Sequence, residues 1–251
     1  MPLSDRLMFS ILLALIVGVI VGLLLDIFAL WLPYCIDREE ARWIAEAKDD
    51  ADDRVIPEKF STLLCGRNYR NHHQWVVVLL STIVVVVCSL QFGWSLRALG
   101  LMGFACGMTT LAVIDQRVNY LPDQLTLPMM WVGLLFQLNP ATKTVGIENA
   151  VLGVVFGYLI LWVVAYLFLK LRGVEGVGYG DMKLMAVVGA WLGPLSIPLV
   201  LFFASLLGIA WQLVAIVRKK MHRQDQFAFG PWIVVCSLLY LFLSQSTLIR
   251  G

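Results

Sequence analysis

IENAVLGVVFGYLILWVVAYLFL, residues 147–169, is the stretch that decides the fold, and it contains a single charged residue, Glu148, near its start. A helix needs about 20 mostly apolar residues to cross the hydrocarbon core of a bilayer. This stretch is long and apolar enough to do so. It therefore predicts a transmembrane helix.

The same pattern recurs along the chain. The two short stretches, 124–138 and 182–193, are expected to be tilted, broken or buried among their neighbours. The sequence therefore predicts an all-α polytopic membrane protein with about eight transmembrane helices, some of them short or broken. The candidate spans are 8–32, 75–93, 96–114, 124–138, 147–169, 182–193, 195–217 and 229–248.

The composition agrees with a membrane protein. Of the 251 residues, 60% are hydrophobic and only 14% are charged, whereas a soluble domain carries about 25% charged residues. The net charge of +2 gives no support for binding nucleic acid. The stretch 8–32 is too long for a signal-peptide core and lacks a small-residue cleavage site, so we expect a retained anchor.

Three regions follow from this pattern. Residues 1–32 form the first transmembrane helix, 33–74 a small loop domain, and 75–251 the membrane-embedded core. Of the 19 Lys and Arg residues, 15 lie in loops on one side. Cytoplasmic loops are rich in Lys and Arg, so this side is predicted to be cytoplasmic and both termini to lie outside. The loop 33–74, Asp115, Asp123 and Asp181 then lie at the cytoplasmic face.

The cysteines show no paired Cys-x-x-Cys motif, so we expect no disulfide framework. Cys65 with His72 and His73 is the one candidate for a metal site in the loop. A closed zinc site needs four ligands, and we therefore predict no bound metal. Three further cysteines lie inside apolar stretches and are expected to act as small hydrophobic residues; they are Cys88, Cys106 and Cys236.

Two aspartates at the ends of apolar stretches are the candidate catalytic residues. Asp115 follows the run from Thr109 to Ile114, and Asp181 lies in Gly178-Tyr179-Gly180-Asp181-Met182-Lys183. Glycine permits unusual backbone dihedrals and close approach, so Gly178 and Gly180 are expected to support the site. The structural alternatives are a boundary carboxylate paired with Arg117 for Asp115, and a helix N-cap for Asp181.

A pair of neighbouring carboxylates shares one proton and titrates as a unit. Such a pair can hydrolyse a peptide without a metal or cofactor. The ionised member takes a proton from water, while the protonated member donates a hydrogen bond to the scissile carbonyl. The residues leave open which aspartate plays which part.

Three charged neighbours have alternative roles. Lys183 could lower the pKa of the pair or bind a substrate carboxylate, but a lysine extending towards the interface is favoured. Asp123 competes with Asp115 for the catalytic role and is a candidate for binding substrate, but we favour a helix N-cap for it. Pro128 predicts a kink or a late helix start. Glu175 is a further candidate for binding substrate, or else an ordinary loop residue.

Small residues spaced four apart favour close helix packing in membranes. Such pairs occur at Gly103 and Gly107, at Gly153 and Gly157, and at Gly189 and Gly193. For each of these glycines the equal alternative is that glycine is simply common in membrane helices.

Three motifs in order resemble those of the type IV prepilin peptidases. Ile114-Asp115 with the run from Leu121 to Pro128 and Trp131 resembles the first aspartate motif of that family. The run from Glu175 to Leu184 resembles its GxGD motif, and Phe229-Gly230-Pro231-Trp232 resembles its late Phe-Gly-Pro element. The resemblance covers about residues 95–235.

The resemblance implies an aspartyl endopeptidase of the bacterial inner membrane. Such enzymes remove a short basic leader from prepilins or type II secretion pseudopilins at the cytoplasmic face, and many also methylate the new amino terminus with S-adenosylmethionine. It places Asp115 and Asp181 at the catalytic positions and Asp123 at a neighbouring motif position. Proteolysis would need no cofactor, and the partners would be the substrate helix and membrane lipid.

One feature departs from the family. Its bifunctional members carry paired Cys-x-x-Cys motifs in the first cytoplasmic loop. This loop has only Cys65, in Leu64-Cys65-Gly66-Arg67-Asn68, apart from Cys35 at its membrane end. Methylation therefore stays an open alternative, and S-adenosylmethionine is a cofactor only if that activity is retained. Two other functions stay open: a proton-coupled transporter that uses the same carboxylates, and an intramembrane aspartyl protease with another substrate.

Overall fold

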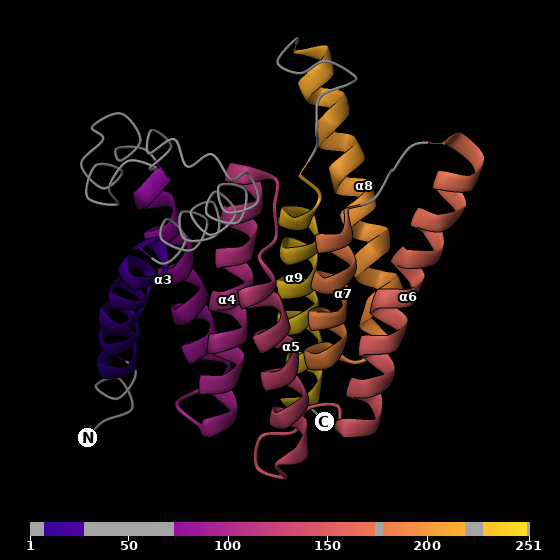
Figure 1. The fold of residues 1–251 in the computed structure, drawn as a ribbon. Helices are drawn as coiled ribbons and strands as arrows, with labels where there is room; N and C mark the ends of the chain where they lie inside the picture. Colours follow the sequence, from indigo (N-terminus) through magenta and orange to yellow (C-terminus); the bar gives the residue numbers. More distant parts are fainter. Residues whose placement is uncertain (1–7, 28–72, 174–177, 219–227, 250–251) are drawn as a thin grey trace, which may run out of the picture. The chain divides into compact units, whose positions relative to one another are not determined.

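A computed structural model describes residues 8–27, 73–173, 178–218 and 228–249 (Figure 1). All regular structure in these ranges is helical, and each helix coincides with a predicted apolar stretch, which confirms the all-α prediction. The helices are Met8–Ile27, α3 (His73–Phe92), α4 (Leu96–Val118), α5 (Asp123–Leu138), α6 (Ile147–Arg172), α7 (Tyr179–Leu192), α8 (Ser196–Val217) and α9 (Gly230–Ile249).

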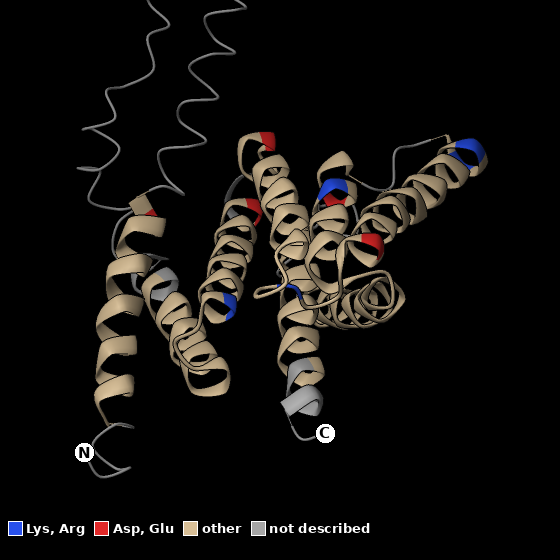
Figure 2. Cartoon of the chain, turned by 90° about the horizontal axis from the view of Figure 1, so that it is seen from below, with Lys and Arg blue, Asp and Glu red and all other residues tan. Residues whose placement is uncertain are grey.

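Four of these helices are long and apolar enough to cross a membrane, and charged residues are sparse along the described helices (Figure 2). This confirms a polytopic membrane protein. The four are Met8–Ile27, Leu96–Gln116, Ile147–Arg172 and Ser196–Val217. Residues 33–72 lie outside the described ranges, so the loop domain and the metal alternative at Cys65 and His72 stay predictions.

The chain divides into two compact units, residues 1–86 and 87–251, with the boundary inside α3. In the first unit the helix Met8–Ile27 packs against α3 through two glycines. A methyl group on Gly18 would lie 2.8 Å from Thr82 Cα, and one on Gly22 would lie 2.8 Å from Val78 Cα. The absence of a side chain at these positions therefore sets how closely the two helices approach.

The short helix α7 is the centre of the second unit. It packs against α5, α6, α8 and α9 (Figure 1). Ten of its 14 residues are buried. A helix that is apolar on every side lies in a protein core or in a membrane. The short predicted stretch 182–193 is buried among its neighbours, which was one of the alternatives for it.

Close packing of α6 on α7 depends on glycine. A methyl group on Gly153 would overlap the backbone of Gly189, and one on Gly157 would overlap the carbonyl of Met185. The packing prediction is therefore confirmed for these glycines. It is wrong for Gly103, which has no neighbouring heavy atom within 4 Å of where a Cβ would lie.

The other glycines of these pairs have separate roles. Gly107 lies against Met129 of α5. Gly193 ends α7 with a φ of 79°, a left-handed backbone conformation that favours glycine. The cysteines behave as predicted, since Cys88, Cys106 and Cys236 are buried and free.

Four helix ends meet at one end of the second unit. The C-cap residue of α4 is Asn119, which has a left-handed backbone conformation with a φ of 49° and a ψ of 37°. The chain then enters α5 at Asp123. The connecting residue Leu121 contacts the start of α7 at Gly180, and Asp115 of α4 contacts the start of α9 at Gly230. The end of α4 and the starts of α5, α7 and α9 are therefore neighbours.

Candidate active site

Asp115 lies in the last turn of α4 and is only 5% exposed. Its Oδ2 atom accepts a hydrogen bond of 3.0 Å from the backbone N–H of Gly230. The helix continues beyond Asp115 to Val118, so the residue is at the helix end, as predicted. The Arg117 side chain lies outside the described part of the chain, and the pairing alternative stays untested.

Asp181 is the third residue of α7 and is partly buried. Burial raises the pKa of its carboxyl group to about 7, and repulsion by the Asp115 carboxylate raises this pKa as well. The structure therefore brings the two predicted carboxylates close enough to interact. The N-cap alternative for Asp181 is wrong, because Gly178 occupies the N-cap position of α7.

The two glycines before Asp181 have ordinary backbone conformations, so the unusual dihedrals predicted for them are wrong, while the close approach of a substrate strand stays a prediction. Gly178 is extended, with a φ of −69° and a ψ of 138°, and Gly180 is helical. Close approach does explain Gly180, since a methyl group there would lie 2.9 Å from Leu121 Cβ. Gly180 therefore allows the α4–α5 connection to lie against the first turn of α7.

Lys183 and Asp123 form an ion pair beside the two aspartates. Lys183 Nζ lies 2.6 Å and 2.7 Å from the two carboxylate oxygens of Asp123. The favoured N-cap role of Asp123 is wrong, since Pro122 occupies that position and makes no side-chain capping bond. Lys183 is partly exposed as well as bonded, and its favoured role as a lysine extending to the interface stays a prediction.

The ion pair is partly exposed, with side-chain exposures of 30% for Lys183 and 45% for Asp123. Pairs of this kind contribute about 0.2–1 kcal/mol. The bond between Lys183 and Asp123 joins the start of α5 to the start of α7. A late start of α5 is wrong as well, because the helix begins at Asp123 and includes Pro128.

Sequence reasoning missed the role of Gly230 at this site. The resemblance of residues 229–232 to a family element marked the region, but a backbone N–H that binds a carboxylate leaves no sequence signal of its own. Glu175 lies outside the described residues, so its substrate-binding role stays a prediction. Within the described ranges no group of three or more His, Cys, Asp or Glu side chains could hold a metal ion.

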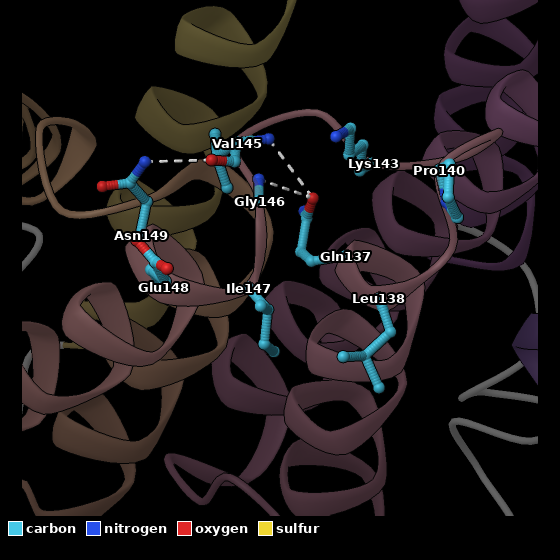
Figure 3. A pocket seen from close by; sticks show the side chains of 9 residues that line it. All are labelled: Gln137, Leu138, Pro140, Lys143, Val145, Gly146, Ile147, Glu148 and Asn149. Carbon is cyan, nitrogen blue, oxygen red and sulfur yellow. Dashed lines mark hydrogen bonds between the residues drawn. The ribbon is translucent and has the colours of Figure 1, made fainter.

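A separate pocket of about 290 Å³ lies at the connection between α5 and α6 (Figure 3). Figure 3 shows Gln137 directed at the backbone of that connection, where its Oε1 atom accepts hydrogen bonds from the N–H groups of Val145 and Gly146 at 3.2 and 3.4 Å. The length of α5 separates this pocket from Asp123 by roughly 20 Å at 1.5 Å per residue. The pocket is therefore not part of the aspartate site.

Comparisons with known proteins place the sequence among a group of related chains. The sequence model described as "Type IV leader peptidase family" matches residues 102–213. This range includes Asp115, Asp123 and Asp181 but ends before Gly230. No solved structure matches the chain at a significant level.

Several relatives are named "Prepilin leader peptidase/N-methyltransferase". The protein from Burkholderia pseudomallei (strain 1026b) is 40% identical over 60% of this chain and 48% of its own length. That from Neisseria gonorrhoeae is 39% identical over 68% of this chain and 58% of its own length. The chain thus spans about half the length of the first of these relatives.

The relative from Escherichia coli (strain K12) is matched more completely. It is 38% identical over 171 residues, which are 67% of this chain and 74% of the relative. The family match contains both candidate carboxylates, and the fold brings them together at one end of the helices. The chain therefore belongs to the type IV leader peptidase family.

Proposed function

We propose that this protein removes the short basic leader peptide from type IV prepilins or type II secretion pseudopilins, with Asp115 and Asp181 as its catalytic pair. The observation that carries the proposal is the juxtaposition of these carboxylates at the meeting point of four helix ends. The names of the relatives support the substrate class.

Burial and the neighbouring Asp115 carboxylate raise the pKa of Asp181, which favours one shared proton on the pair near neutral pH. The protonated member donates a hydrogen bond to the scissile carbonyl, and the ionised member takes a proton from the attacking water. Collapse of the tetrahedral intermediate passes a proton to the leaving amine, and the shared proton returns to the pair.

The excess of Lys and Arg on one side supports a site at the cytoplasmic face of the bacterial inner membrane. A prepilin leader that has not crossed the membrane would reach it there. Proteolysis by this pair uses water and no cofactor. Methylation of the new amino terminus stays an open second activity, which the names of the relatives favour and the absence of a Cys-x-x-Cys motif from the sequence disfavours. S-adenosylmethionine would serve that activity only.

Co-expression with a prepilin tests the proposal. Asp115→Asn and Asp181→Asn should each leave the precursor uncleaved, because each removes one member of the pair. Asp123→Asn should keep appreciable activity, since it breaks only a partly exposed ion pair.

Mass spectrometry of the processed pilin reports the cleavage point and the presence or absence of a methyl group. Normal processing by either of the first two variants would contradict the assignment of the catalytic pair.

A further inference from the structure

We infer that Gly230 is a positioning residue of this site: its backbone N–H fixes the Asp115 carboxylate for the reaction, and its missing side chain makes room for that carboxylate. The inference rests on the proposed function, because Asp115 must be catalytic for its orientation to matter. Nothing in the family match covers this residue, since the matched range ends at residue 213.

The contact joins two buried groups that are distant in the sequence. Gly230 is buried, Asp115 is 5% exposed, and the N–H···Oδ2 distance is 3.0 Å. A hydrogen bond to a carboxylate is stronger than one between neutral groups. It fixes the torsion of the Asp115 side chain, and thereby the direction in which the other carboxylate oxygen faces.

This N–H is available because of its place in α9. The first N–H groups of a helix have no partner inside the helix. In this first turn, Trp232 and Ile233 donate to the carbonyl of Phe229 at 3.1 and 3.3 Å, and Pro231 has no N–H. The N–H of Gly230 is therefore the one that reaches out of α9 to Asp115. The positive end of the helix dipole also favours a carboxylate at this point.

The requirement for glycine comes from space and not from backbone conformation. Gly230 is not among the described glycines with positive φ. A methyl group at its Cα would lie 2.6 Å from Asp115 Oδ2 and 3.1 Å from Asp115 Cγ. These distances are too short for contact, so alanine would turn the carboxylate away or move the start of α9. Either change breaks the hydrogen bond.

Steady-state cleavage of a prepilin by the purified full-length protein in detergent measures the catalytic consequence. Gly230→Ala should lower kcat about tenfold or more while KM changes less than about twofold, because misplacing a reacting group acts on the chemical step. Gly103→Ala is the matched control on α4, since its methyl group would meet no heavy atom within 4 Å. An unchanged kcat for Gly230→Ala would overturn the inference and leave the proposed function intact.

Thermal unfolding provides a second measurement that does not depend on activity. Gly230→Ala should lower Tm in the wild-type protein but not in the Asp115→Ala background, where the carboxylate is gone. An equal loss in both backgrounds would overturn the inference, because the glycine would then serve only the packing of α9. If Gly230→Ala alone fails to accumulate, the Gly230→Ala variant in the Asp115→Ala background should still accumulate. Failure of this double variant to accumulate would also overturn the inference. A wild-type protein that cleaves no leader would instead overturn the proposed function.

Discussion

Asp181 needs a raised pKa to share a proton in the proposed reaction, and the same raised pKa lowers the free energy of unfolding at neutral and higher pH. Burial and the neighbouring Asp115 carboxylate raise the pKa of Asp181 from the ordinary 3.8 to about 7. Between pH values of about 4 and 7 the folded protein therefore binds protons that the unfolded chain has released. Stability must then fall as the pH rises from about 4 towards about 7, because the folded state binds more protons over this interval.

This predicts a stabilising substitution at the catalytic pair. Asp181→Asn should have a higher Tm than the wild type at pH 8, and the difference should shrink as the pH falls towards 5, because asparagine is neutral throughout. Thermal unfolding in detergent across this pH range measures the effect. Gln124→Asn, an amide-to-amide change at an exposed position of α5, is the control. Parallel wild-type and Asp181→Asn curves would contradict the prediction.

The sequence identifies residues whose role is local or carried by a motif, and it misses those whose role depends on helix packing. Asp115 and Asp181 stand out because a carboxylate at the end of an apolar stretch needs an explanation. The bond from Lys183 to Asp123 spans 60 residues, and it arises only because α5 and α7 begin at the same place. Because the neighbouring sequence contains no sign of this bond, it favoured a helix N-cap for Asp123 and a lysine extending towards the interface for Lys183.

At the scale of helices, α7 depends on its contact with α6. Gly153 of α6 and Gly189 of α7 place the two backbones in direct contact, where no side chain fits. Apolar helices gain little from the hydrophobic effect when lipid replaces water around them, so close packing is a main source of their association. Asp181 lies at the start of α7, and its position is set by this contact.

Gly153→Ala should therefore destabilise the protein by about 1–3 kcal/mol, the range for overpacking a close contact. It should also lower prepilin cleavage, because α7 carries Asp181. Thermal unfolding and cleavage assays of the same preparation measure both effects. Gly103→Ala serves as the control, since its methyl group would face open space. A Tm equal to that of the wild type would show that α6 and α7 tolerate a wider spacing.

The positions of the helices could be predicted from the lengths of the apolar stretches. The residues at which the helices begin were harder to predict. Pro128 predicted a kink or a late start of α5, yet the helix begins at Asp123. A proline removes one backbone bond and crowds the carbonyl four residues before it. In α5 that carbonyl belongs to Gln124, in the first turn. Most of the helix follows the disturbed turn and packs normally against α7.

For the whole molecule, the distribution of Lys and Arg predicts the orientation in the membrane. Tyr120 and Ala141 are exposed residues beyond opposite ends of α5. A membrane-impermeant maleimide added to intact cells should label Ala141→Cys, whereas Tyr120→Cys should react only after permeabilisation. The protein without an added cysteine gives the background, and its described cysteines are buried. The reverse labelling pattern would place the aspartates on the outer face.

The bonds between α5 and α7 have a mechanical consequence. The Lys183–Asp123 pair joins these helices at one end. Trp191 Nε1 donates to the Met129 carbonyl at 2.9 Å, and Gln137 Nε2 donates to the Trp191 carbonyl at 3.3 Å. Asp181 therefore lies on a helix that is bonded to α5 along its length. Asp115 lies on α4, which is bonded to the start of α9. Helix α4 also contacts α5 and, through the stacked rings of Phe104 and Trp191, α7. The separation of the two carboxylates therefore depends on contacts near Trp191, at the far end of α7, as well as on the first turn that carries Asp181.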